Sequence, residues 1–410
     1  MDSSISIRKY PYPYRAALAI CSDLDLTLDR HVYFETAKFL NTTQETRMGE
    51  GVGLEVGNSI YFDMPPGHFS YWNTDNEGRE TIRALIRSGH IDCLHSFGDL
   101  ATTRAHAERA LEELERHGCH LEVWVDHAKA PSNLGADIMC GSGDILQSPV
   151  FHADITCEFG VRYVWRGRVT SVIGQNAPRN LNGIFNRQCP LESTKTVVKE
   201  FGKGILAKVG YPKYAMHGQN EVLRETKLRS GNHVMEFIRS NPYWGGVEHG
   251  ATADCFENVL TKSIFDRLCE REGILILYTH LGKSSTPDLP FGNGTRNAFS
   301  LLARYRREGK ILVTTTRRLL GFCASVWKTR IAAAINDGKT SVFLEVEEGN
   351  GDSRSLPQDL AGYTIYAPDP DKTRVFVNKR EVLQLDCNGP DHTGRTSISI
   401  PWPSLQFPSI

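Results

Sequence analysis

Short apolar runs alternate with amphipathic stretches through about the first three hundred residues of the chain. This alternation is typical of parallel strands joined by helices. Residues 16–21 (AALAIC) predict a buried strand, and residues 103–117 predict a helix that begins at capping threonines and ends at Gly118. The pattern therefore predicts an α/β architecture.

Other elements follow from the same periodicity. We expect further strands at residues 59–62, 121–125, 161–165, 274–279 and 311–315, and further helices at residues 80–88, around residues 256–268 and at about residues 295–307. Each of these strands ends at polar residues, and an α/β scaffold gathers such residues around one mouth. A functional site is therefore expected where the strands end.

The domain organisation can be read from changes in composition. The length of 410 residues suggests two or three domains. After about Trp327, strand-like runs such as SVFLEV and TRVFVN are separated by turns such as GNGDS and PDPDK. We therefore expect an α/β domain over residues 1–325 and a small β-rich domain over residues 326–410. Within the first domain, residues 176–250 are crowded with Pro, Gly and Asn and predict an irregular insertion.

Charge and composition exclude several classes of protein. Lys and Arg number 47 against 48 Asp and Glu, so the chain as a whole lacks the strong positive field on which binding to nucleic acid or to an anionic membrane usually depends. No run approaches the roughly 20 apolar residues of a membrane span, and the opening segment does not read as a secretion signal, so we expect a cytoplasmic protein. The ten Cys are scattered singly, which indicates neither a disulfide framework nor a zinc knuckle. The oligomeric state is left open by the sequence.

Three groups of side chains follow predicted strands. They are Asp23 with Asp25, His95 with Asp99, and His280. Carboxylates and imidazoles together suit a divalent ion, with open positions left for water. Taken singly, each residue also has a structural explanation, such as a helix cap or turn for Asp23 and Asp25, so the hypothesis depends on their order and spacing.

The segment Gly89 to Asp99 (GHIDCLHSFGD) resembles the metal-binding motif GHEIGNHTFSH of the polysaccharide deacetylases, the NodB-type family. The acidic run Ser22-Asp23-Leu24-Asp25 is similar to the family's TFDD motif. The resemblance implies that Asp23 is the catalytic base and that Asp25 and His95 are metal ligands. Asp99 stands where a second metal histidine is usual, and because a carboxylate binds the same ions we expect it to be the third metal ligand.

Downstream motifs extend this resemblance over about residues 14–320 and also depart from it. The family places an arginine after a later strand to orient the catalytic aspartate, whereas this chain has Trp-Val-Asp126-His127-Ala-Lys129 at that place. Asp126, His127 or Lys129 are candidates to replace the arginine, and we expect His127 to do so. The run ILILYTH resembles the family's last motif, which makes His280 the general acid.

The resemblance implies a distorted (β/α) barrel that removes an acetyl or related acyl group from a sugar or glycan. It implies a divalent cofactor, with zinc expected ahead of manganese, iron, cobalt or nickel. The aromatic candidates for stacking on sugar rings are Trp72, Tyr243 and Trp244, and the histidines that are candidates to line the mouth are His152, His217 and His249.

Two other functions stay open at this point. One is a catalytically inactive carbohydrate-binding protein, because the family arginine and one metal histidine are missing from their usual places. The other is a metal-dependent amidase that acts on a C–N bond outside sugars, since a fold does not determine its substrate.

Overall fold

The fold is that of a computed structural model, which describes residues 5–23, 26–128, 130–242, 251–286, 288–346 and 360–409. The helices are α1 (Arg30–Asn41), α2 (Asn76–Arg87), α3 (Arg104–Arg116), α4 (Ala153–Phe159), α5 (Pro190–Lys208), α6 (Lys262–Glu270), α7 (Asn293–Arg307) and α8 (Thr316–Lys328). Short 3-10 turns lie at Leu181–Gly183, Pro212–His217, Phe256–Asn258 and Pro370–Lys372.

The largest sheet of the described residues has 11 strands. They are β2 (Ala16–Ser22), β5 (Gly57–Ile60), β6 (Ile91–His95), β7 (Val123–Val125), β8 (Tyr163–Trp165), β9 (Val169–Thr170), β10 (Leu223–Lys227), β11 (His233–Phe237), β12 (Arg239–Ser240), β13 (Ile274–Thr279) and β14 (Ile311–Val313). Their order is β10-β11-β8-β7-β6-β5-β2-β13-β12-β9, with β14 also paired to β2. All neighbours are parallel except β10 and β11, so the expected α/β architecture is present.

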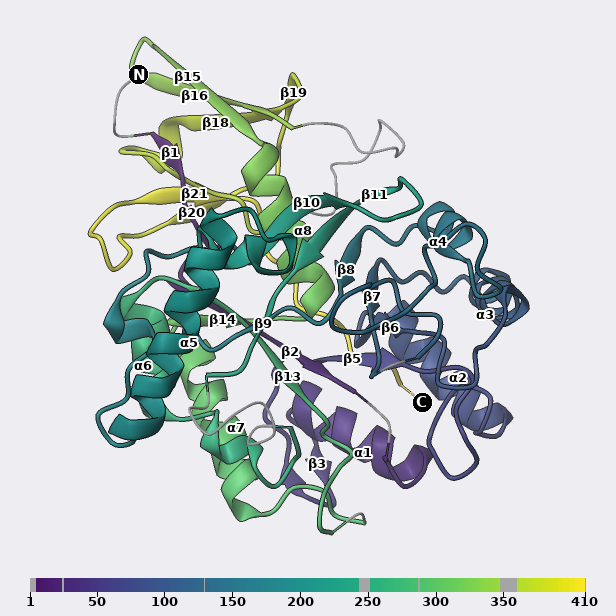
Figure 1. Cartoon of the computed structure of the whole chain (residues 1–410). Helices are drawn as coiled ribbons and strands as arrows, with labels where there is room; N and C mark the ends of the chain where they lie inside the picture. Colours follow the sequence, from purple (N-terminus) through teal and green to yellow (C-terminus); the bar gives the residue numbers. More distant parts are fainter. Residues whose placement is uncertain are drawn as a thin grey trace.

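The sheet curls back on itself. Strands β11 and β12 are separated only by Ile238, yet β11 pairs with β8 and β12 pairs with β13. One continuous stretch of chain therefore connects two distant parts of the strand order, around the central pair β2 and β13 (Figure 1). As a result the carboxyl ends of the parallel strands face a common mouth, in the manner of a distorted barrel.

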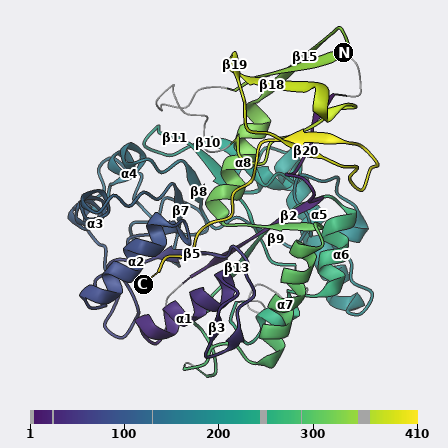
Figure 2. The same ribbon diagram turned by 180° about the vertical axis from the view of Figure 1, so that it is seen from behind.

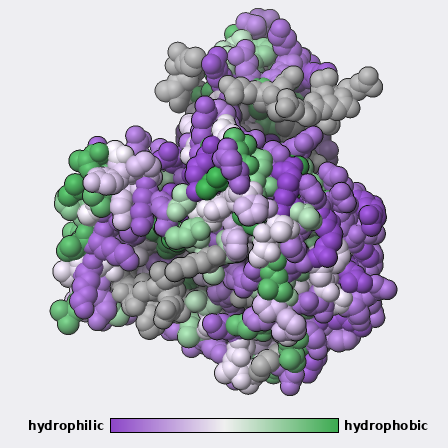
Figure 3. Space-filling view, turned by 45° about the vertical axis from the view of Figure 1, so that its right-hand side comes forward, coloured by the Kyte–Doolittle hydropathy of each residue, from purple (hydrophilic) through white to green (hydrophobic). Residues whose placement is uncertain are grey.

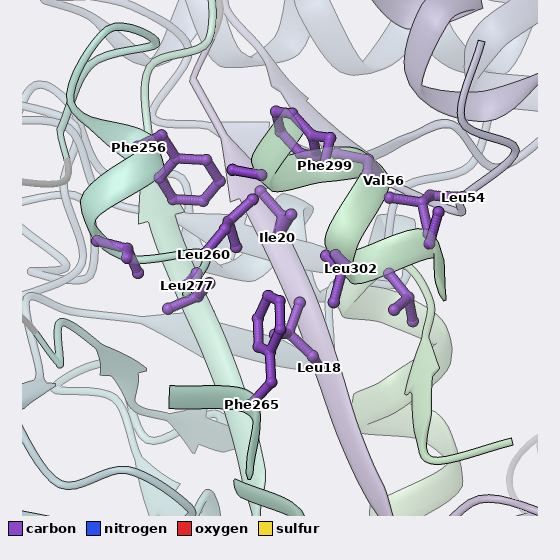
Figure 4. Close-up of a cluster of buried hydrophobic side chains, with 14 of the residues drawn as sticks. Leu18, Ile20, Leu54, Val56, Phe256, Leu260, Phe265, Leu277, Phe299 and Leu302 are labelled. Atoms are coloured by element: carbon purple, nitrogen blue, oxygen red, sulfur yellow. The ribbon is translucent and has the colours of Figure 1, made fainter. Parts of the chain in front are cut away.

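Apolar residues of β2 explain why this strand lies at the centre. All seven of its residues are buried, and the run has no polar alternation, as expected for a strand covered on both faces. Leu18 and Ile20 pack with Leu277 of β13 and with apolar side chains of α6 and α7 (Figure 4). Burial of each such side chain contributes about 1.5–3 kcal/mol to folding. This core fixes the strand that ends at Asp23.

Most elements predicted from periodicity are found, with shifted ends. The strand at 274–279 is confirmed over its full length, and the helix expected at 103–117 is α3. The helix expected around residues 256–268 is instead a 3-10 turn followed by α6, with Thr261 capping the helix through a hydrogen bond from the Ile264 amide. The described part of the expected insertion contains the 19-residue helix α5 and three strands of the main sheet, and is thus partly regular.

The C-terminal region forms two further four-stranded sheets. Their strands are β1 (Ser6–Ile7), β17 (Thr364–Tyr366), β21 (Ser397–Ser399) and β20 (Asp386–Asn388) in one sheet, and β15 (Arg330–Asn336), β16 (Lys339–Glu345), β18 (Thr373–Val377) and β19 (Arg380–Glu381) in the other. Strand β1 belongs to the N-terminal end of the chain, so the β-rich unit is built from both ends. It rises above the rest of the molecule in the space-filling view (Figure 3).

The last residues of the chain return from these sheets to the barrel (Figure 2). Trp402 packs against Phe322 of α8 with ring centroids 6.0 Å apart, and the Leu405 amide donates to Glu55 at 3.1 Å. Near the end, the ring of Phe407 contacts Phe34 of α1 at 5.6 Å. The tail therefore ties the β-rich unit to the barrel.

Candidate active site

Asp23 lies at the end of β2 and is 1% exposed. Its backbone amide donates to the Thr279 carbonyl of β13 at 2.9 Å, which fixes the chain where the strand ends. Ser59 of β5 donates from its hydroxyl to Oδ1 of Asp23 at 2.9 Å. The carboxylate is thus held from both neighbouring strands.

His95, the last residue of β6, faces Asp23 with its Nε2 atom 3.2 Å from Oδ2. Its Nδ1 donates to the Val125 carbonyl at 2.9 Å, so the neutral ring presents the lone pair of Nε2 to the carboxylate. Burial lowers the pKa of His95, although Asp23 opposes this shift, which favours that neutral ring. Two acceptors that face each other need a proton or a cation between them.

Arg239 supplies a positive charge beside Asp23, at the place for which the sequence suggested His127. Arg239 is fully buried in β12, with Nη2 4.0 Å from Oδ1 of Asp23. Its guanidinium lies 4.1 Å from the ring centroid of Trp165 and 4.8 Å from that of Tyr278. These two rings are nearly parallel, so the guanidinium is held by stacking on both.

His280 follows β13 and completes the group around Asp23. Its Nδ1 donates to the Ala251 carbonyl at 2.8 Å, and its Nε2 lies 2.9 Å from the Tyr278 hydroxyl oxygen. The same Nε2 lies 3.8 Å from Oδ2 of Asp23. The structure therefore brings together Asp23, His95 and His280, three residues singled out in the sequence.

Charge around Asp23 determines its ionisation. Burial alone would raise the pKa of this carboxyl, but His95 when it carries a proton on Nε2, Arg239, and His280 when protonated outweigh burial and hold the pKa well below its usual range. Arg239 contributes a charge that does not titrate at any ordinary pH. Asp23 is accordingly a carboxylate at neutral pH and is able to accept a proton.

Asp99 and His127 form a pair of their own. The Nδ1 atom of His127 donates to Oδ1 of Asp99 at 2.8 Å, and this hydrogen bond lowers the pKa of Asp99. The His127 ring packs edge-on against the rings of His95 and Tyr61, with centroids 4.9 and 5.0 Å apart. His127 thus lines the site and orients Asp99.

Asp126 and Trp72, both predicted near the substrate, have structural roles in the described chain. Asp126 is buried and accepts hydrogen bonds from the Trp124 indole and from the amides of Leu134 and Gly135. Trp72 packs edge-on against Phe62 and Tyr71, and Arg109 covers its ring. These contacts give Asp126 and Trp72 structural roles, and the roles toward the substrate for which both were candidates stay predictions.

Two histidines that were candidates to line the mouth are also explained by packing. His152 is buried, with its ring nitrogens bonded to the Thr156 hydroxyl and the Ser132 carbonyl, and burial lowers its pKa to about 4. His217 lies beneath α5, with Nδ1 3.4 Å from Glu200.

Several predicted site residues lie outside the described residues. They are Asp25, Lys129, Tyr243, Trp244 and His249. Among the residues that are described, no group of three or more His, Cys, Asp or Glu side chains is arranged to hold a metal ion. His95 nevertheless fits a ligand role, because its Nδ1 is tied to a carbonyl and its Nε2 faces a carboxylate. His95 is thus a candidate ligand, and its expected partner Asp25 lies outside the described residues.

Two cavities flank the strands at opposite ends. A cavity of about 350 Å³ lies among loops that follow β2 and β5, lined by residues 28–31, 67–69 and 73–75. A larger one of about 980 Å³ lies between the amino end of β6, the start of α8 and the β-rich unit, lined among others by Asp92, Arg317 and Leu383. His95 ends β6, so the larger cavity is at the far end of the strand from the candidate site.

The residue missed in the sequence is Arg239. It follows the run Val234 to Ile238, which is apolar except for Glu236, and thus stands after a buried strand as His280 does. Because Pro, Gly and Asn residues surround it, the sequence pattern did not predict a strand here.

Comparison with protein-family models finds no match for the chain, and comparison with curated proteins finds none either. Among solved structures, the chain is similar to a GH57 branching enzyme from the hyperthermophilic archaeon Thermococcus kodakaraensis, with 9% identity and a TM-score of 0.31 over 75% of this chain and 71% of that one. It is also similar to an endo-β1,6-glucanase, with 8% identity and a TM-score of 0.30 over 98% of this chain and 92% of that one. TM-scores of this size do not establish a shared fold.

None of the described helices combines the length and the apolar character that are needed to cross a lipid bilayer.

Proposed function

We propose that the chain is a hydrolase that removes an acetyl or related acyl group from the nitrogen of a carbohydrate. The observation that carries the proposal is the buried, ionised Asp23, which is held among Arg239, His95 and His280 where four parallel strands end. A carboxylate and a histidine side by side can supply a proton acceptor and a proton donor to the same reaction. The choice of a sugar as substrate depends on the resemblance to the polysaccharide deacetylases.

The reaction assigns one role to each residue. Asp23 takes a proton from water while the water oxygen forms a bond to the acyl carbon, and the C–N bond then breaks. His280 gives a proton to the departing amine, so that a free amine and a carboxylate are the products. Arg239 keeps Asp23 ionised and in place through its charge and through stacking on Trp165 and Tyr278.

A divalent ion at His95 and Asp25 would polarise the acyl oxygen and make water more acidic. His95 has the geometry of such a ligand, because the Val125 carbonyl fixes its tautomer and leaves Nε2 toward the site. Asp99 stays a candidate ligand through the oxygen that does not bond His127.

Release of acetate from a panel of N-acetylated sugars and oligosaccharides tests the proposal. The wild-type protein should release acetate and amine in equal amounts, should lose activity with a chelator, and should recover it with zinc or manganese. Asp23→Asn should lower kcat by a factor of about 10²–10⁴. The matched control is Asp154→Asn on α4, a partly exposed carboxylate paired with Arg104, which should leave kcat unchanged.

Three results would reject the proposal. One is a panel without turnover by the metal-loaded wild-type protein. Another is equal turnover by wild type and Asp23→Asn. The third is cleavage of cyclic amides in preference to acetylated sugars, which would keep the site but replace its substrate.

A further inference from the structure

Large apolar side chains are exposed to an unusual degree around helix α5. Between residues 181 and 211 the exposed ones are Leu181, Leu191, Val198, Phe201, Ile205, Val209 and Tyr211. Phe201 is 69% exposed and Leu191 is 73% exposed, whereas exposed apolar side chains elsewhere in the described chain are scattered. A contiguous apolar surface of this kind is the mark of an interaction site.

The four of these side chains that lie in α5 share one face of the helix. Leu191, Val198, Phe201 and Ile205 are separated by seven, three and four residues, which is the spacing of a helical stripe. The opposite face is the buried one and includes Ser193, Thr196, Glu200 and Gly204. Glu200 accepts a hydrogen bond from the Thr170 hydroxyl of β9, so α5 is fixed to the barrel by that face. The apolar stripe is therefore turned outward by the fold itself.

Positive charge borders the stripe. Residues 181–213 contain six Lys or Arg and two Glu. Glu200 is buried against Lys203, which leaves Arg187, Lys195, Lys199, Lys208 and Lys213 exposed against the single exposed acid Glu192. The overall formal charge of the chain is −1, so this local excess is hidden in the total.

We propose that the outer face of α5 docks the protein onto the surface of an anionic lipid membrane. A helix with an apolar stripe and flanking lysines lies in the plane of a membrane interface, with its apolar side chains among the acyl chains and its lysines at the headgroups. Tyr211, just beyond the end of α5, is an aromatic residue of the type that anchors at the headgroup level. The inference stands apart from the proposed hydrolase function and does not use any residue of the candidate active site.

A second copy of the chain fits this surface less well than a membrane. Packing α5 against α5 of another copy would bring the lysines of both helices to the same border, where like charges repel. Anionic headgroups instead pair with these lysines, each contributing about 1 kcal/mol to membrane attraction.

Vesicle co-sedimentation tests the proposal with the full chain. Phosphatidylcholine vesicles that contain phosphatidylglycerol should bind the protein, vesicles of phosphatidylcholine alone should bind it far less, and high salt should weaken binding. The double variant Phe201→Ser/Ile205→Ser should lower the vesicle partition coefficient by about tenfold or more. Lys195→Gln/Lys199→Gln should lower it by about fivefold for each lysine.

A matched control lies on the β15–β16 hairpin, where Ile335 is 54% exposed and Lys339 is also exposed. Ile335→Ser/Lys339→Gln should bind vesicles as the wild type does. Equal binding to neutral vesicles, no binding to anionic vesicles, or unchanged binding by the α5 variants would overturn the proposal. So would a concentration-dependent dimer that Phe201→Ser/Ile205→Ser dissociates in the absence of lipid, because a second copy would then be the occupant. Circular dichroism of each variant confirms that it is folded.

Discussion

At the scale of single residues, the site depends on a buried pair of opposite charges. Asp23 and Arg239 are both almost inaccessible to solvent and come from strands far apart in the sequence. Removal of one member of a buried pair leaves the other without compensation, which costs more than the pair itself contributes. Stability should therefore respond strongly to single changes here.

Arg239→Gln should lower the free energy of unfolding by about 3–5 kcal/mol, because Asp23 then stays buried without a positive partner. Urea denaturation measures this loss. The double variant Asp23→Asn/Arg239→Gln should be more stable than Arg239→Gln alone, since no buried charge is left. Additive effects of the two substitutions would show that the charges are not coupled.

Gly98 gives a second prediction at this scale. Its φ is +102°, and a Cβ atom would lie 2.3 Å from the Asp63 carbonyl oxygen. Gly98→Ala should thus lower the free energy of unfolding by about 2–4 kcal/mol through backbone strain and overlap. Gly67, with a φ of +89° and no atom within 4 Å of a Cβ, is the matched control, and Gly67→Ala should cost about 1–2 kcal/mol. Equal thermal stability of the two variants would contradict this account of the segment before Asp99.

At the scale of elements, a strand and a helix are joined by a buried carboxyl group. Asp92 of β6 accepts a hydrogen bond from the Arg317 amide at 2.8 Å, and so caps the beginning of α8. Thr315 precedes that helix without a side-chain cap of its own. Burial raises the pKa of Asp92 to about 6. The cap is therefore a protonated acid at mildly acidic pH and a carboxylate at neutral pH.

This shift predicts a dependence of stability on pH. Between about pH 4 and pH 6 the folded chain keeps a proton on Asp92 that the unfolded chain has released, so the free energy of unfolding should fall as pH rises, by up to about 3 kcal/mol. Denaturant titrations over this range should show a smaller slope for Asp92→Asn. Burial also raises the pKa of Asp126 to about 6. The variant should therefore still show part of the dependence of the free energy of unfolding on pH. Equal slopes would mean that Asp92 has an ordinary pKa in the folded protein.

The elements also show how far the sequence predicts the site. His280 was found because it ends the apolar run ILILYT, and His95 was found because its segment resembles the deacetylase motif. No sequence pattern identified Arg239, because β12 has only two residues and lies among Gly, Pro and Asn residues, where hydrophobic periodicity is lost. The pairing of His127 with Asp99 joins two loops that only tertiary packing brings together, and no local pattern encodes it.

At the scale of the whole molecule, both ends of the chain contribute to the β-rich unit, and the tail fastens it to the barrel. Strand β1 could not be foreseen in that unit, because two residues give no periodic pattern and their pairing with β17 spans most of the sequence. Trp402 carries the tail contact, with the guanidinium of Arg318 4.1 Å from its ring centroid.

Trp402→Ala should lower the free energy of unfolding by about 2 kcal/mol, less than for a fully buried Trp because its side chain is only partly covered. Trp327 is 61% exposed and gives the matched control, where Trp327→Ala should change stability by about 0.5 kcal/mol or less. Thermal unfolding of the two variants compares them directly, and equal shifts in Tm would show that the tail does not fasten the two parts.

The account as a whole treats the group around Asp23 as a metal-assisted hydrolytic centre. A crystal structure of the protein soaked with zinc or manganese tests this most directly. It should show one ion within about 2.0–2.3 Å of His95 Nε2 and of a carboxylate of Asp25, with Asp23 close by but free to accept a proton. An ion bound only elsewhere, or His95 Nε2 still against Asp23 with no ion between them at saturating metal, would contradict it.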